Sequence, residues 1–590
     1  MKKYILFAWT ALIAVGLGAQ AVTNITCTEP LALQAMKGVH SPADYAATNV
    51  IDDHQQILCE LRTRLSPDSL KSFLQHMEGF YTRHSYSDTV SPNTGIGAAR
   101  RWAFGKFQEF SAANEDRLIP AYLQFDWPGG VCGDGLGWRN VFAVLPGADT
   151  TDHRIVLIEA HLDSRCREDC DATCLAAGME DNGSGSALVL ELARVMSRYT
   201  FRHTLVFLLT TAEEQGLIGA SAMAQFCVDE AIAIKGVQNN DVVGGILCGE
   251  TSSPPSCPAE GDVDSLQVRL FSSASLSSPH RGFARTVKMY YQEKMQSQVP
   301  VPMTISIMAQ EDRTGRGGDH IPFRVKGFRN LRFTSANEHG DASTDSSWYH
   351  DRQHTSDDIL GVDTDGDLIV DSFFVDFNYL QRNAVINGMS AALLALGPET
   401  PTFVVHDEPN GLRVSLNGAP SLAAYRIGVR STNANLDFDA VYRTTDTSYV
   451  IAGLLAGEIY YISVAGIDSA GIMSPFSHES LKGNDADTPA APTDQLPYGI
   501  ACAPISVPEV VATMGTLTIV PDPASDIITL VTDQPVGNVV LLDVMGREVL
   551  RTRVVTGTSI TVAQLPAGSY SIVLLGSDNS VRAHARFIKN

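Results

Sequence analysis

Roughly the first two-thirds of the chain alternates between helical and strand-like hydrophobic patterns. From about residue 27 to 122, apolar side chains recur mainly at helical spacing. Later apolar runs are short and nearly continuous, which predicts strands buried on both faces, at 140–145, 155–158 and 204–209. Residues 186–199, between two of these runs, predict a helix. This alternation is typical of an α/β fold with a mixed, mostly parallel sheet flanked by helices.

After residue 396 the pattern changes to short segments in which apolar and polar residues alternate, with Gly and Pro between them. Such segments predict two small all-β sandwich domains joined by a Pro-rich linker. We therefore expect an α/β domain with an N-terminal helical segment at 22–398, a β-sandwich at 399–484, a linker at 485–514 and a second β-sandwich at 515–590.

The N-terminus has the pattern of a secretory signal peptide. Lys2 and Lys3 precede an apolar run at 4–17, and small residues follow at 19–21. We expect residues 1–21 to be removed and the mature chain to be exported. No later stretch is apolar over the roughly 20 residues that a spanning helix requires, so the mature chain is predicted to have no transmembrane segment.

The net charge of the chain limits which partners it can bind, and its cysteine content indicates the compartment in which it folds. The formal net charge of −23 would repel a phosphate backbone, which argues against nucleic acid as a partner. Ten cysteines in an exported protein favour disulfides. Cys166, Cys170 and Cys174 are crowded into one segment, and we favour disulfides over a metal site there, although the pairing stays open.

Histidine and acidic residues follow the predicted strands. His161 and Asp163 come directly after the run at 155–158, and His161 offers a nitrogen that zinc can bind. Asp163 is placed to accept the second ring N–H of His161, which would fix the tautomer of the imidazole. This pair alone is a common pattern.

Further candidate metal ligands are informative when their order along the chain is considered together. Glu213 and Glu214 follow the run at 204–209, where adjacent carboxylates are costly without a cation. The remaining candidates are the acids Asp181 and Asp241 and the histidines His350 and His354. Asp181, taken alone, could equally cap a helix. Two histidines and three carboxylates suit a borderline metal such as zinc, and one carboxylate can bridge two ions.

The motif order from 140 to 354 resembles that of the M28 family of zinc exopeptidases, with looser similarity from 85 to 396. The resemblance implies a zinc exopeptidase fold holding two zinc ions. It implies that Asp181 bridges the ions, that His161 and Asp241 complete one site, and that Glu214 and His354 complete the other. Glu213 would then be the general base that takes a proton from the metal-activated water.

Three residues compete with this assignment. Some family members place a ligand in the segment that would correspond to Glu250, but Asp241 is preferred. His350 competes with His354, although the family's His-Thr-x-x-Asp pattern matches better from His354 onward. His320 lies in a segment that resembles one near the family's substrate pocket, and we leave it out of the metal set.

Both C-terminal domains resemble known modules. Residues 454–465 resemble the late strands of fibronectin type III domains. The final unit resembles the C-terminal sorting domain of type IX secretion cargo on three motifs in order, at 520–524, 542–549 and 566–570. The resemblance implies the type IX secretion machinery as a partner. It also implies a secreted product, extracellular or at the cell surface after passage through the periplasm and outer membrane.

The leading hypothesis is hydrolysis of the N-terminal residue from peptide substrates. Glutaminyl-peptide cyclase and carboxypeptidase are alternatives on the same scaffold. A non-catalytic surface adhesin is a third class, but it predicts broken ligands, and all five ligands are present. Residues 363–371 place alternating acids around a Gly as calcium loops do, yet they lack the twelve-residue loop with its terminal Glu, so a solvated acidic loop is favoured.

Overall fold

The structure is a computed structural model in which two compact units, residues 1–502 and 503–590, can be distinguished. It describes residues 22–248, 262–273, 279–313, 316–337, 352–367, 369–409, 411–418, 421–432, 436–485, 517–532, 537–542, 548–554, 557, 559–575 and 581–590. The predicted signal peptide at 1–21 and nearly all of the predicted linker at 485–514 lie outside these ranges.

A nine-stranded mixed sheet organises the larger unit, with strand order β1-β2-β3-β5-β4-β6-β9-β7-β8. The strands are β1 (Thr23–Cys27), β2 (Ile119–Gly130), β3 (Gly133–Leu145), β4 (Ile155–His161), β5 (Leu205–Thr210), β6 (Ile234–Asn240), β7 (Gln267–Phe271), β8 (Thr304–Ile307) and β9 (Asn330–Ser335). Neighbours in the central run β5-β4-β6-β9 are parallel. Antiparallel pairs flank this run on both sides, and the outer pair β7–β8 is again parallel. The prediction of a mixed sheet is therefore confirmed, whereas "mostly parallel" is wrong, because parallel and antiparallel pairs are equal in number.

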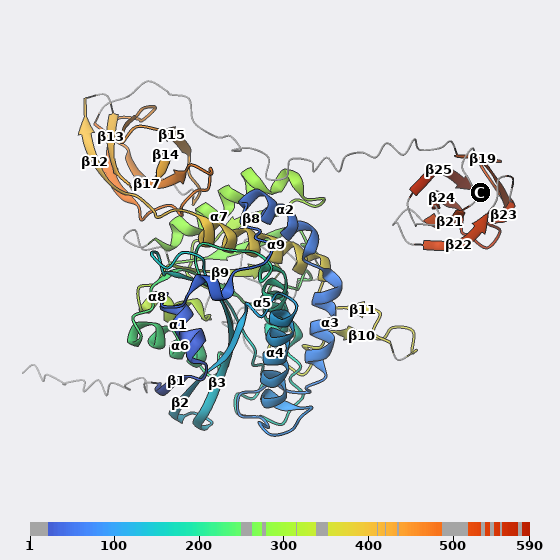
Figure 1. The fold of residues 1–590 in the computed structure, drawn as a ribbon, viewed down its shortest axis with the longest axis horizontal. Coiled ribbons are helices and arrows are strands. Elements are labelled where there is room, and N and C mark those ends of the chain that lie inside the picture. Colours follow the sequence, from blue (N-terminus) through green and yellow to red (C-terminus); the bar gives the residue numbers. More distant parts are fainter. Residues whose placement is uncertain are drawn as a thin grey trace, which may run out of the picture. The chain divides into compact units, whose positions relative to one another are not determined.

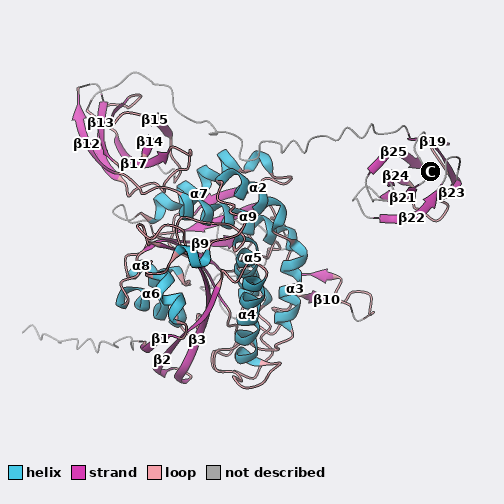
Figure 2. Cartoon of the chain, in the orientation of Figure 1, coloured by secondary structure: helices cyan, strands magenta, loops and turns pink. Residues whose placement is uncertain are grey.

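Helices cover both faces of the sheet (Figures 1 and 2). They are α1 (Pro30–Met36), α2 (His54–Arg64), α3 (Pro67–Glu78), α4 (Gly95–Ala112), α5 (Gly185–Met196), α6 (Ile218–Asp229), α7 (His280–Lys294), α8 (His320–Val325) and α9 (Phe377–Leu396), with short helices at Pro42–Tyr45, Met179–Ser184 and Gln296–Gln298. One hydrophobic cluster packs α2–α5, α7 and α9 against the sheet, and a second packs α1, α6 and α8 on the other face. Over the described residues, every helix is too short or too polar to span a bilayer.

The central strands form because their side chains are apolar on both faces. Every residue of β5 is buried, and β4 is buried along its whole length. The predicted runs at 140–145, 155–158 and 204–209 all fall in strands, and the predicted helix at 186–199 corresponds to α5. Edge strand β1 was not predicted, because its largely exposed residues carry no apolar run.

Two packed sheets follow the α/β region. One contains β12 (Thr402–Glu408), β13 (Gly411–Asn417) and β16 (Ser448–Ile451), and the other contains β14 (Leu422–Ser431), β15 (Ala440–Thr444), β17 (Ile459–Asp468) and β18 (Ser480–Gly483). Their inner faces share one apolar core. A small hairpin, β10 (Gly361–Val362) with β11 (Ser372–Phe373), precedes them.

Buried charges join these sheets to helix α7. Glu479 accepts hydrogen bonds from Arg430 at 2.7 and 2.8 Å and from Arg285 of α7 at 2.8 Å. Arg426, whose side chain is fully buried, pairs with Glu293 of α7 at 2.8 Å. Because burial of such charges is costly unless they are paired, this surface is a fixed interface within the larger unit.

The described residues of the second unit form β-sheets and no helices. A three-stranded sheet holds β19 (Leu517–Val520), β20 (Ile527–Thr532) and β23 (Ser559–Thr561), and a four-stranded sheet holds β21 (Gly537–Leu542), β22 (Glu548–Val554), β24 (Gly568–Leu575) and β25 (Val581–Lys589). They enclose an apolar core of their own. The middle of the predicted motif at 542–549 lies outside the described residues.

Removal of the Glu479 carboxylate tests this interface. We expect Glu479→Ala to lower the free energy of unfolding of the larger unit by about 3–5 kcal/mol, because it leaves two buried guanidinium groups without their shared partner. Asp407→Ala is the matched control, since Asp407 pairs with Lys482 at 3.5 Å on the surface, where such a pair contributes about 0–1 kcal/mol. Urea denaturation measures both, and equal losses would contradict the interpretation.

Candidate metal centre

The predicted metal ligands converge at one edge of the sheet. His161 is the last residue of β4, Glu213 and Glu214 follow β5, and Asp241 follows β6. Because β5, β4 and β6 are parallel neighbours, their carboxyl ends meet at this edge, which is where open α/β sheets bind ligands. Three elements separated in sequence therefore deliver their polar side chains to one place.

Asp181 lies between two histidine–carboxylate pairs. Its Oδ1 is 3.1 Å from His161 Nε2, and its Oδ2 is 3.1 Å from His354 Nε2. On one side, Asp241 Oδ1 is 3.4 Å from His161 Nε2. On the other side, Glu214 Oε2 is 3.2 Å from His354 Nε2. The five predicted ligands thus form two clusters that share one carboxylate.

These donors fit a metal. His161 Nε2, Asp241 Oδ1 and Glu214 Oε1 are buried and have no hydrogen-bond partner. Buried polar atoms without partners cost free energy, and several carboxylates at one point cost more, so a cation at this point would offset both costs. Imidazole nitrogen and carboxylate oxygen are ligands that suit zinc.

Glu213 lies beside the His161 half of the site. Ligand atoms of Glu213, His161 and Asp241 all lie within 4.8 Å of one another. Burial raises the pKa of Glu213 well above its ordinary value; the positive charge of His161 opposes the shift and the negative charge of Asp241 adds to it. A carboxyl group with a raised pKa can take and return a proton near neutral pH.

Asp163 acts differently from the prediction. The closest contact of His161 Nδ1 is the backbone oxygen of Asp163 at 3.1 Å, whereas the carboxylate Oδ1 is 3.7 Å away. The carboxylate instead accepts the backbone N–H groups of Glu213 at 3.2 Å and Glu214 at 3.3 Å. The expected carboxylate–imidazole bond is not formed, because the backbone oxygen of Asp163 takes the place of its carboxylate at His161 Nδ1.

Of the three alternative ligands, His320 is the one within the described residues. Glu250 and His350 lie outside the described residues. His320 is fully buried, its Nε2 lies 3.1 Å from the backbone oxygen of Glu311, and its Nδ1 lies 3.8 Å from Asp312. These contacts agree with leaving His320 out of the metal set. Asp363, Asp365 and Asp371 do gather at the β10–β11 hairpin, but Asp363 and Asp371 accept backbone N–H groups, as a solvated turn does.

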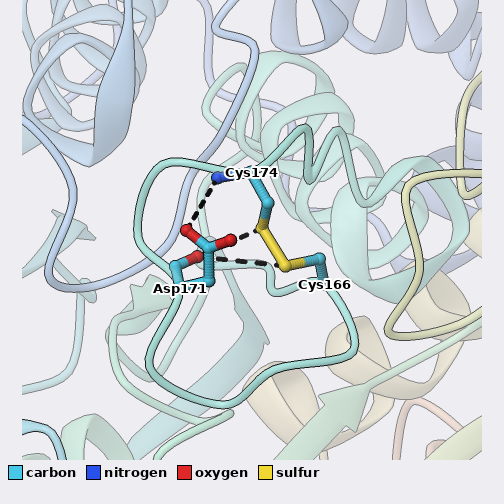
Figure 3. Close-up of side chains that lie close together, drawn as sticks. All are labelled: Cys166, Asp171 and Cys174. Carbon is cyan, nitrogen blue, oxygen red and sulfur yellow. Dashed lines mark hydrogen bonds between the residues drawn. A yellow bond between two sulfur atoms is a disulfide. The ribbon is translucent and has the colours of Figure 1, made fainter.

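The crowded cysteines form disulfides. Cys166 is bonded to Cys174, and Cys132 is bonded to Cys170. Figure 3 shows the first of these bonds closing a loop around Asp171. The preference for disulfides over a metal site is confirmed there, and the two bonds staple the segment that follows His161.

Comparison with known proteins agrees with this geometry. Residues 140–367 match the sequence profile of peptidase family M28. A protein of Pyrenophora tritici-repentis named "Probable zinc metalloprotease" is 30% identical over 369 residues, which cover 60% of this chain and 79% of that protein. The chain belongs to peptidase family M28.

Other similar proteins extend the comparison. A "Probable zinc metalloprotease" of Pyricularia oryzae is 28% identical over 437 residues, covering 70% of this chain and 82% of that protein. The solved structure of the LapA aminopeptidase of Legionella pneumophila overlaps with a TM-score of 0.40 at 16% identity, covering 60% of this chain and 80% of that chain. The M28 relatives imply zinc as the metal of the site.

Sequence reasoning missed the residues that hold the M28 ligands in place. Asp358 accepts the backbone N–H groups of Glu180 at 2.8 Å and Asp181 at 2.9 Å, so it connects the segment of Asp181 to the segment that carries His354. Arg332, fully buried, lies 3.0 Å from Asp241 Oδ2. In the sequence, Asp358 is visible only as the last residue of the His-Thr-x-x-Asp pattern, and no local pattern marks Arg332.

The N-terminal helical region also supplies such contacts. Ser85 Oγ donates to Asp163 Oδ2 at 3.2 Å and accepts the backbone N–H of Ala212 at 3.0 Å. Arg83 is fully buried and donates to the backbone oxygens of Leu162 at 2.7 Å and Gly178 at 2.9 Å. This segment therefore supports the ligand loops from outside the sheet.

Truncation of Asp358 tests the connection between the two ligand segments. We expect Asp358→Ala to cost about 1–3 kcal/mol for each of the two buried N–H groups that lose their acceptor. Its exposed neighbour gives the control, because Asp357→Ala should change the free energy of unfolding by less than about 0.5 kcal/mol. Chemical denaturation of the metal-free proteins compares them, and a stable Asp358→Ala protein would refute this role.

Proposed function

We propose that this M28 peptidase is a secreted aminopeptidase that removes N-terminal residues from peptides with two zinc ions. The observation that supports this proposal best is the position of Asp181, whose two oxygens face two separate histidine–carboxylate pairs. A single carboxylate shared in this way suits a bridging ligand of a two-metal hydrolase.

The ligand roles follow from the contacts. His161 and Asp241 would hold one zinc, Glu214 and His354 would hold the other, and Asp181 would bridge them. Zinc, when bound, polarises a carbonyl oxygen and lowers the pKa of a water molecule. The arginine on the outer oxygen of Asp241 leaves the inner oxygen directed at His161, which keeps that ligand oriented.

Glu213 moves the proton in this proposal. Its carboxylate accepts a proton from the attacking water, and the water oxygen forms a bond to the scissile carbonyl carbon. The carbon–nitrogen bond then breaks, and Glu213 returns the proton to the nitrogen of the leaving amine. Asp163 positions this base, because its carboxylate accepts the backbone N–H of Glu213.

Several observations favour an aminopeptidase over its alternatives. A carboxypeptidase needs a cation that can bind the substrate carboxylate. Among the described arginines near the site, Arg316 donates to Gln353, Arg352 lies 3.7 Å from the centroid of the Phe374 ring, and Arg165 contacts Glu214 and His354. Arg313 is fully engaged near Asp312 and Asp241. A glutaminyl cyclase usually has two acids before its His-Ile-Pro-Phe segment, where this chain has Gly318 and Asp319.

Export belongs to the same proposal. The apolar leader at 1–21 supports secretion, and the motifs at 520–524 and 566–570 support a type IX sorting role for the final β unit. Disulfides at Cys166–Cys174 and Cys132–Cys170 agree with an oxidising compartment. The fibronectin type III-like sheets would then travel with the peptidase as part of the larger unit.

Replacement of the base tests the mechanism. Glu213→Gln keeps the size of the side chain but cannot take a proton, so we expect kcat to fall by about 10²–10⁴-fold while zinc content stays at two per chain. Glu168→Gln, on the exposed part of the neighbouring loop, should leave both quantities unchanged. Activity assays with metal analysis by mass spectrometry decide the question, and an active Glu213→Gln enzyme would remove the base assignment.

A panel of peptides with blocked ends tests whether the enzyme acts at the N-terminus or the C-terminus of its substrate. We expect cleavage of peptides with a free N-terminus, no cleavage after N-acetylation, no effect of C-terminal amidation, and loss of all activity after chelation. The products would be followed by mass spectrometry. A requirement for a free C-terminus would identify a carboxypeptidase, and loss of ammonia from N-terminal glutamine without hydrolysis would identify a cyclase.

A further inference from the structure

Arg165 lies against the Glu214 and His354 half of the site. Its Nε is 3.1 Å from Glu214 Oε2, and its Nη2 is 2.7 Å from His354 Nδ1. Its side chain is 18% exposed; Nε and Nη2 face the candidate ligands, and Nη1 pairs with Asp169 on the exposed loop. A fixed positive charge therefore occupies the outer side of one ligand pair.

In the other half of the site, the arginine contacts the ligand oxygen that does not face the histidine. Arg332 contacts Asp241 through Oδ2, while Oδ1 of the same carboxylate faces His161. Arg332 thus leaves the inner oxygen available. Arg165, by contrast, contacts Glu214 Oε2, which is also the oxygen that faces His354 Nε2, while Oε1 of Glu214 has no hydrogen-bond partner. The opposition to a cation therefore comes from the charge of Arg165 and from its contact with His354.

The contact between Arg165 and His354 also opposes the binding of a cation. A guanidinium group can only donate hydrogen bonds. A neutral imidazole that binds a metal through Nε2 carries its hydrogen on Nδ1, and that N–H would point at a second donor. Arg165 therefore has to withdraw from Nδ1 when a cation occupies the Glu214 and His354 position, and the two positive charges also repel.

The segment around Arg165 restricts this withdrawal. Asp169 pairs with Arg165 Nη1 four residues along the loop. The disulfides Cys166–Cys174 and Cys132–Cys170 close the loop on both sides of Asp169 (Figure 3 shows the first). His84 approaches the same loop, with Nε2 2.9 Å from the backbone oxygen of Asp169. Arg165 directly precedes this covalently closed loop and contacts it through Asp169, so its backbone position beside the ligands is constrained.

We propose that Arg165 makes the two metal positions unequal by opposing the cation at Glu214 and His354. The inference rests on the two-zinc function proposed above. The position at His161 and Asp241 fills first, and the second fills only at higher free zinc, when the metal displaces the guanidinium. Arg165 thereby sets the zinc concentration at which the complete pair of metals is present.

Zinc titration of the full-length mature chain tests this inference. Equilibrium dialysis against buffered free zinc, followed by mass spectrometry, gives the two dissociation constants. We expect Arg165→Gln to lower the dissociation constant of the second zinc by at least about tenfold and to leave the first within about twofold. Arg165→Lys, which keeps the charge but loses the planar fork, should fall between the two proteins.

Arg167→Gln is the matched control, because it removes the same charge from an exposed position two residues away, and neither constant should change. Two equal dissociation constants in the wild-type protein would overturn the inference. The inference would also be overturned if the dissociation constant of the second zinc were the same in both Arg165 variants as in the wild-type protein. If those variants still bound two zinc ions, the proposed two-zinc function would remain. A wild-type chain that binds no zinc would instead overturn the proposed function itself.

Discussion

The structure of the site depends on the concentration of carboxylates at the carboxyl edge of a buried parallel sheet. Asp181, Glu214 and Asp241 direct oxygens toward His161 and His354 in a place with little solvent, and such a cluster is unfavourable without positive charge. Burial lowers the pKa of His161, but Glu213 and the other carboxylates around it outweigh that effect and hold the pKa well above its ordinary value. The negative charge of this edge is what a divalent metal would balance.

A layer of fixed contacts surrounds this charge and keeps the ligands oriented. Each ligand segment is bound to a second segment by an acceptor or a cation: Asp163 holds the backbone at Glu213, and Asp358 holds the backbone at Asp181. These contacts join strands, loops and the N-terminal helical region, so the ligands cannot move independently. Outer contacts of this kind are as necessary to a metal site as the ligands themselves.

Much of the fold and the ligand set could be predicted because both leave local signals. An apolar run such as Leu205–Thr210 predicts a buried strand, and acids directly after it predict a ligand edge. The contacts of Asp358, Arg332 and Ser85 leave no such signal, because their partners lie far away in sequence and become neighbours only in the folded chain. The sequence likewise does not show that the backbone oxygen of Asp163 faces His161 Nδ1, or that the carboxylate accepts a backbone N–H group fifty residues away.

Backbone conformation shows how rigidly the ligands are held. Ala212, Val242 and His354 adopt positive φ angles of 61°, 56° and 58°, although none is a glycine. Each is a candidate ligand or is adjacent in sequence to a candidate ligand or to the candidate base. Such conformations cost about 1–3 kcal/mol each and persist only where the surrounding structure enforces them. Ser85 accepts the N–H of Ala212, and Asn182 accepts the N–H of Val242, so hydrogen bonds from other segments enforce two of these turns. The chain therefore stabilises the ligand geometry with its own contacts, and at the Glu214 and His354 position only the guanidinium of Arg165 would have to move for a metal to enter.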